Sequence, residues 1–219
     1  MMKRVFPLIL ICVLSLAFLN GCASKSEIVK LPRPVGTIAV AGFTNPVFNW
    51  ELLAGYLPHE GQPIKPEVLQ QLDEKMVAVL ARHGVKGYAR PAITRQCQEI
   101  EVFENMGSRR EAAFSYWIKV GECMTADYIL VPQVIFWQDL RGMKKADYNI
   151  QPASVILDLY LIDVNNKRIV RRYHFDETQQ PLTANMLNAD TFFKRGGKWV
   201  KAMELADEAL ETGLTELGL

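Results

Sequence analysis

The stretch VILDLYLIDVNNKRIVRRYHF, residues 155–175, decides the fold of this 219-residue chain. Its first half alternates between two faces, as a β-strand does, and one face carries Val155, Leu157, Leu159 and Leu161. Residues 165–167, Asn-Asn-Lys, form a turn, and residues 168–175 return as a second strand. We therefore expect an antiparallel hairpin with one face on a hydrophobic core.

Two runs before the hairpin also predict strands. Residues 126–137, ADYILVPQVIFW, are long and apolar, and residues 37–43, TIAVAGF, have the composition of a buried strand. Because Pro132 lacks an N–H, we expect the longer strand either to bulge there or to lie at an edge of the sheet. A further short strand is expected at residues 86–89.

Three helices are expected between and after these strands. Apolar residues recur at helical spacing over residues 66–83, and Gly84 ends that helix as a left-handed cap. Residues 108–111, SRRE, have the spacing of a capping box, which opens a helix that continues to Gly121. A last helix is expected over residues 199–217. The order β-α-β-α-β-β-β-α predicts an α+β fold, a mixed sheet of about five strands flanked by helices.

Three phrases carry a resemblance to a known fold group. They are TIAVAGFTNP at residues 37–46, ADYILV at 126–131 and LIDVNNKRIV at 161–170. Together with the element order, they resemble the periplasmic fold shared by the TolB amino-terminal domain, CsgG and LpoB. The resemblance implies a single periplasmic domain over residues 37–219, which works by protein–protein contact and has no catalytic residues. The amphipathic hairpins of CsgG and the long arm of LpoB have no counterpart that we recognise in this sequence.

The beginning of the chain predicts export and lipidation. Lys3 and Arg4 precede an apolar run over residues 5–19, which is shorter than the ~20 residues of a membrane-spanning helix. Residues 19–22, LNGC, resemble the lipobox that lipoprotein signal peptidase cuts. We expect residues 1–21 to be a signal peptide and Cys22 to carry a diacylglycerol. The alternative is an ordinary cleaved signal, with Cys22 as a spare thiol.

Residues 22–36 are polar and contain prolines, so we expect a short lipidated tether to the membrane. More than one acyl chain is needed for stable anchoring, and a lipidated cysteine supplies them. In the enterobacterial sorting rule, an Asp directly after the cysteine retains a lipoprotein in the inner membrane. Ala23 stands there instead. The periplasmic face of the outer membrane is therefore favoured, and the inner membrane is the alternative.

Charge and cysteine content narrow the function. Removal of Lys3 and Arg4 with the signal peptide changes the net charge from +1 to about −1, and nucleic-acid binding needs a basic patch. We therefore expect no nucleic-acid partner. Cys97 and Cys123 remain besides Cys22, and in an oxidising periplasm such a pair predicts a disulfide. A zinc site is the alternative, although no nearby histidine cluster or C-x-x-C spacing supports it.

The histidines do not form a catalytic pattern. His59, His83 and His174 are expected in a loop, at a helix end and on a strand. His174 and Asp176 can share one face of a strand, which leaves a metal pair as the alternative to a solvated strand end. Neither a nucleophile elbow nor a phosphate-binding glycine loop is present. We expect a protein that is not an enzyme and needs no metal or cofactor.

Two stretches combine irregular backbone with large apolar side chains, residues 48–57 and 186–199. Exposed aromatics grouped on loops can anchor partners, so Phe48, Trp50, Phe192 and Phe193 are candidates for a partner surface. The alternative is that both loops fold back and cover the sheet.

Taken together, these features predict a non-catalytic lipoprotein that assembles or supports an envelope or secretion complex, with self-association as one form of contact. The alternative is a periplasmic carrier for a small apolar or lipid ligand.

Overall fold

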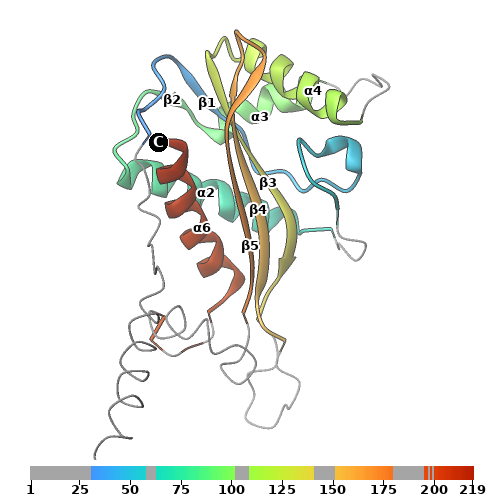
Figure 1. Cartoon of the computed structure of the whole chain (residues 1–219), viewed down its shortest axis with the longest axis vertical. Coiled ribbons are helices and arrows are strands. Elements are labelled where there is room, and N and C mark those ends of the chain that lie inside the picture. The colour runs from blue at the N-terminus through green and yellow to red at the C-terminus, as the bar shows by residue number, and fades with distance from the viewer. Residues whose placement is uncertain are drawn as a thin grey trace, which may run out of the picture.

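The computed structural model describes residues 31–57, 63–101, 109–140, 151–179, 195–196, 198 and 200–219. Its five-stranded sheet has the order β2-β1-β3-β4-β5 (Figure 1). The strands are β1 (Ile38–Val40), β2 (Tyr88–Ala89), β3 (Tyr128–Gln138), β4 (Ser154–Asp163) and β5 (Arg168–Thr178). β1 pairs in parallel with β2 and β3, whereas β3, β4 and β5 are antiparallel. The expected α+β fold with a mixed sheet is confirmed.

Helices cover both faces of the sheet. They are α2 (Pro66–Arg82), α3 (Pro91–Ile100), α4 (Arg109–Cys123) and α6 (Ala202–Leu217), with a 3-10 turn η2 (Asn49–Glu51). α2 and α6 pack on one face, and α3 and α4 pack on the other (Figure 1). The chain therefore folds as three layers with the sheet in the middle.

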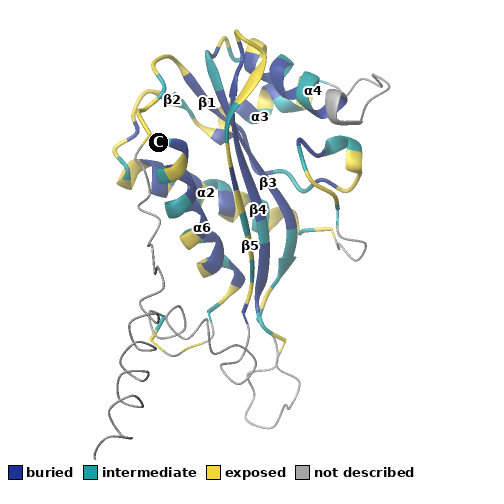
Figure 2. Cartoon of the chain, viewed as in Figure 1, coloured by how far each residue is buried: buried dark blue, intermediate teal, exposed yellow. Residues whose placement is uncertain are grey.

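Two hydrophobic cores lie on the two faces of the sheet, and Figure 2 shows the buried residues along the strands. The first core joins α2 and α6 to the face of β4 that was expected from the alternation: Val155, Leu157, Leu159 and Leu161. The second core joins α4 to the opposite face of β3 and β4, and Trp117 and Tyr160 are its largest fully buried side chains. The central strands are thus buried on both sides.

Two features of the helices differ from the expectation. Helix α3 was not expected, because it has only ten residues and its few apolar side chains, at Ile93, Cys97 and Ile100, form a stripe less than two turns long. Its first residue, Pro91, suits a helix start, since proline there removes no helical hydrogen bond. The last helix begins at Ala202 rather than at residue 199, and Trp199 lies outside the described residues.

Pro132 lies in a central strand, so the expectation of a bulge there or an edge strand was wrong. It pairs with Leu159 of β4, and the bulge of β3 comes later, between Val134 and Phe136. On its other side, the carbonyl oxygen of Pro132 accepts a hydrogen bond from the Thr44 amide, at 3.3 Å. Between β1 and Thr44, the polar groups of the backbone bind side chains rather than β3: the Gly42 amide and carbonyl bind the Gln98 amide group, and the Phe43 amide donates to Asp73. The Gly42 carbonyl therefore has a donor other than Pro132.

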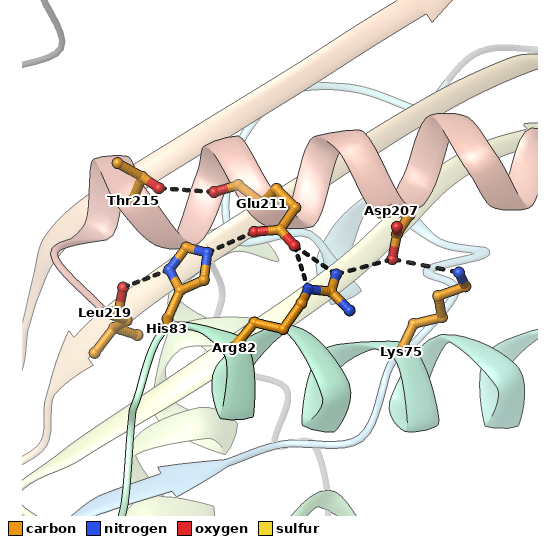
Figure 3. A network of polar contacts seen from close by, with 7 residues as sticks. All are labelled: Lys75, Arg82, His83, Asp207, Glu211, Thr215 and Leu219. Atoms are coloured by element: carbon orange, nitrogen blue, oxygen red, sulfur yellow. Dashed lines mark hydrogen bonds and ion pairs between the residues drawn. The ribbon is translucent and has the colours of Figure 1, made fainter.

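A network of charged side chains joins α2 to α6 (Figure 3). The Arg82 guanidinium binds the carboxylates of Glu211, at 2.5 Å, and of Asp207, at 3.4 Å. The two ring nitrogens of His83 contact Glu211, at 2.6 Å, and the carbonyl oxygen of Leu219, at 2.9 Å. The C-terminal ends of both helices are therefore held together on the solvent side of the first core.

This network predicts a loss of stability in acid. Partial burial raises the pKa of Glu211, but hydrogen bonds from His83 and Arg82 outweigh that effect and hold it below its ordinary value of 4.5. As the pH falls, the Glu211 carboxylate therefore binds a proton at a higher pH in the unfolded chain than in the folded one. The free energy of unfolding consequently falls as the pH drops below 4.5. We expect Glu211→Gln to be less stable than the wild type near neutral pH and to lose less stability on acidification. Urea titrations across this pH range measure the free energy of unfolding of both proteins. An equal fall of that free energy with pH in the wild type and in Glu211→Gln would contradict the role assigned to Glu211.

Candidate interaction surface

The segment between β1 and α2 exposes large apolar side chains on a loop, residues 44–57. Val47, Phe48 and Tyr56 are 50%, 56% and 81% exposed. The rings of Phe48 and Trp50 stack in parallel, with centroids 5.6 Å apart and an angle of 9° between their planes. Of the two candidate surface residues in this stretch, Phe48 is exposed and Trp50 is partly buried.

The other side of the same loop is buried. Leu52 and Leu53 are 1% and 6% exposed, and Leu53 belongs to the second core. The 3-10 turn η2 packs against α4, which provides much of that core. Part of the loop therefore covers the sheet, as the alternative interpretation held, while Phe48 and its neighbours face outward. The two interpretations apply to different residues of one loop.

Side chains fix the backbone of the loop at three points. The buried amide of Gln133, on β3, donates to the Glu51 carbonyl at 2.8 Å and accepts from the Leu53 amide at 3.3 Å. The Glu51 carboxylate accepts from the Val47 and Phe48 amides, at 2.7 and 3.0 Å. Asn45 bridges β3 and the chain before α2, through Val134 and Ile64. The aromatic pair thus stands on a backbone that is already ordered, which lowers the entropy cost of binding a partner.

A groove lies between α2 and α3, apart from the loop of residues 44–57. Its volume is about 790 Å³, and its lining combines apolar side chains with charged ones: Leu69, Val77, Pro91, Asp73, Glu74 and Arg95. Asp73 binds the Phe43 amide and Arg95; burial raises the pKa of its carboxyl more than these bonds lower it. Because Glu74 is exposed, this groove is open to solvent. A carrier of an apolar ligand would be expected to have a closed apolar pocket instead.

Cys97 of α3 and Cys123, the last residue of α4, are joined by a disulfide in the structure. Their Cα atoms are 6.0 Å apart. The bond ties the short helix α3 to α4 beside the second core. Cys22 and the other two candidate surface residues, Phe192 and Phe193, lie outside the described residues.

A buried carboxylate on the sheet was not expected from the sequence. Asp158 of β4 is 2% exposed and accepts hydrogen bonds from Arg172 at 3.1 and 3.3 Å, from His174 at 2.8 Å and from the Tyr160 hydroxyl at 3.0 Å. Burial is the largest cause that raises the pKa of Tyr160. Four hydrogen bonds satisfy the carboxylate, so the cluster stabilises the hairpin. His174 therefore binds Asp158 across the hairpin rather than forming a pair with Asp176.

In the part of the chain that the structure describes, no three or more histidine, cysteine, aspartate or glutamate side chains lie close enough together to bind a metal ion. None of the helices in the same residues has the length and hydropathy needed to cross a bilayer.

Comparisons with known proteins find similar structures but no related sequence family. No family model matches the chain, and no curated protein matches it. A PelC dodecamer from Paraburkholderia phytofirmans is 16% identical, with 86% of this chain and 91% of that chain covered, and a TM-score of 0.46. The LpoB C-terminal domain from Escherichia coli is 14% identical, with 70% and 92% covered and a TM-score of 0.38. Lipoprotein GNA1162 from Neisseria meningitidis is 14% identical, with 74% and 99% covered and a TM-score of 0.36.

These values describe a likeness in fold alone, and we draw no function from them. The LpoB part of the resemblance expected from the sequence is found among the solved structures. Resemblance to the TolB amino-terminal domain and to CsgG stays a prediction.

Proposed function

We propose that the chain is a non-catalytic lipoprotein of the cell envelope, which is anchored through Cys22 and contacts a protein partner through the loop of residues 44–57. The observation that supports this proposal best is the stacked pair Phe48 and Trp50. Aromatic residues are the commonest energetic anchors of protein interfaces. In the described residues, this pair lies on a loop that is exposed on one side and fixed to β3 on the other.

The proposal combines this surface with the lipobox at residues 19–22. A lipid on Cys22 would confine the domain to a bilayer surface and raise its local concentration there. A partner in the same membrane or the adjacent periplasm is then met at an effective concentration far above that of a free periplasmic protein. Modest contacts through one loop are sufficient under such conditions.

The test compares two pairs of substitutions in the full-length lipoprotein. Phe48→Ala with Trp50→Ala removes the aromatic pair. Ile93→Ala with Ile100→Ala is the matched control, because these residues of α3 are 53% and 71% exposed but lie outside the loop. The control should unfold within about 1 kcal/mol of the wild type, since surface substitutions seldom cost more. The aromatic variant also loses the stacked pair, about 1 kcal/mol more, so recovery is compared under conditions where both variants stay folded. Partners are recovered by crosslinking in cells, detergent extraction and mass spectrometry.

We expect the aromatic variant to reduce recovery of the main crosslinked partner about tenfold or more, whereas the control leaves it unchanged. A second copy of this chain as that partner would identify a homo-oligomer. Equal recovery with both variants would reject the loop as the contact surface. Recovery of a monomer with a bound lipid and no protein would favour the carrier alternative instead.

A further inference from the structure

The segment that precedes β1 is bound to one end of the domain by two arginines. Arg33 donates to the carbonyl oxygens of His83 and Gly84, at 3.2 and 3.3 Å, where α2 ends. Arg171 donates to the carbonyl oxygens of Pro32, at 2.9 Å, and of Leu217, at 2.5 Å, where α6 ends. Carbonyl groups at helix C-termini favour cations, so these contacts are electrostatically favourable. The chain is therefore fixed from Pro32 onward.

We call this end of the domain the tether end and define it by residues 31–35, 84–86, 168–171 and 217–219. Figure 1 marks the C-terminus there, and Figure 3 shows His83 and Leu219 in contact at the same place. Cys22 precedes Pro32 by ten residues, which span at most about 36 Å when fully extended. The first turn of α2 is separated from the tether end by the length of that helix, roughly 25 Å.

The surface chemistry of the tether end suits a lipid bilayer. Three of its side chains are exposed and apolar: Leu31 (40%), Val35 (94%) and Ile169 (40%). The hydrogen bonds of Arg33 and Arg171 go to backbone carbonyls. Among the described residues, no carboxylate lies within hydrogen-bond distance of either guanidinium. Lys86 is exposed as well. Apolar side chains with cations nearby favour the interface of membranes that contain anionic lipids, and here the carboxylate of Asp127, beside Gly36, is bound by the Thr37 amide and hydroxyl.

We propose that the tether end is the membrane-facing surface of this protein. Leu31, Val35 and Ile169 enter the headgroup layer, and Arg33 and Lys86 bind the phosphates of anionic lipids. The loop of residues 44–57 is then left available to partners in the periplasm. This inference rests on the proposed lipidation of Cys22, and the experiment below separates the two.

Two variants, each with one added cysteine besides the Cys97–Cys123 disulfide and the lipidated Cys22, report the orientation. Ala81→Cys and Glu67→Cys place a thiol on exposed positions in the last and first turns of α2. Fourteen residues make almost four complete turns, so both labels lie on nearly the same face, about 21 Å apart along the axis. The full lipoprotein is labelled with a fluorophore and inserted into phosphatidylethanolamine–phosphatidylglycerol vesicles that carry an energy acceptor on their headgroups. Greater transfer from position 81 than from position 67 is expected; equal transfer would overturn the proposal.

A charge reversal then tests the lipid contact. Lys86→Glu changes the tether end, and Lys65→Glu, just before the other end of α2, is its matched control. On vesicles with phosphatidylglycerol, Lys86→Glu is expected to lower about fivefold the ratio of molecules that turn the tether end toward the bilayer to molecules in other orientations. Lys65→Glu is expected to have little effect on this ratio. Equal effects of the two reversals would overturn the headgroup contact.

Mass spectrometry of the purified protein reports the diacylglycerol on Cys22. Its absence would overturn the proposed anchor and this inference with it, whereas equal transfer from a lipidated protein would overturn the inference alone.

Discussion

Replacement of both Cys97 and Cys123 by serine is expected to lower the free energy of unfolding by about 3 to 4 kcal/mol. The disulfide links residues 26 positions apart in the sequence, and a crosslink of that span removes conformational freedom mainly from the unfolded chain. For a domain of this size, such a loss lowers the melting temperature by roughly 10 °C. Urea and thermal unfolding of the double variant measure both quantities.

The local effect of this substitution should appear at α3. This helix has only ten residues, and its apolar Ile93 and Ile100 are exposed, so few packing contacts hold it in place. Isolated helices of this length are marginal in water. Amide hydrogen exchange is therefore expected to rise in α3 before it rises in α2 or α6. As a control, a reducing agent should bring the wild type to the stability of the double variant and leave that variant unchanged. An equal response of both proteins to the reducing agent would contradict the assignment of the bond.

The sequence alone is sufficient to predict the strands and most of the helices, because each has a clear period or a clear boundary. The face of β4 toward α6 follows directly from the alternation of Val155, Leu157, Leu159 and Leu161. Gly84 has a φ of +67°, as a left-handed helix cap requires. By contrast, α3 is too short and too polar for its periodicity to be recognised.

The cluster around Asp158 shows why contacts across strands are harder to predict than the strands themselves. Asp163 pairs with Arg168 and Ile162 with Ile169, and a regular hairpin would continue this register. Asp158 would then lie opposite Tyr173, a residue that packs in the first core. A bulge after Leu161 shifts β5 by one residue and brings His174 opposite Asp158. Since one extra residue reverses the faces of a strand, no pattern in the sequence indicates this pairing.

The candidate surface was predicted in part for a similar reason. The number of aromatics in a proline- and glycine-rich loop predicts Phe48 and Trp50 as surface residues. The residue that fixes this loop, Gln133, lies on a strand more than seventy positions later. Its role depends on the parallel contact between Thr44 and Gln133, a tertiary register that local propensity does not encode.

Substitution of Trp117 by alanine is expected to cost about 3 to 5 kcal/mol, the largest single effect that we predict. Trp117 is 1% exposed and is the largest fully buried side chain of the described residues. Its ring meets that of Tyr116 edge to face, with centroids 4.9 Å apart, and Tyr116 donates to the Gln98 carbonyl of α3 at 2.7 Å. Removal of the indole therefore leaves a cavity where α4 meets the sheet.

The same substitution should act on the partner surface as well as on stability, because Leu53 and Trp117 belong to the same core. When that core loosens, the loop of residues 44–57 loses its buried support, and the Leu53 amide should exchange faster with solvent. Leu72→Ala is the matched control, since Leu72 is fully buried in the first core and its truncation costs a similar 2 to 5 kcal/mol, roughly.

Hydrogen exchange and partner recovery in these two variants, compared at conditions where both remain folded, separate the cores. With Trp117→Ala we expect faster exchange at Leu53 and weaker crosslinking through Phe48, while Leu72→Ala changes neither beyond its effect on global stability. If both variants loosened the loop equally, the loop would depend on the stability of the whole domain. If only Trp117→Ala does so, the second core is the element that orders the aromatic pair for binding, and its packing sets the affinity for the partner.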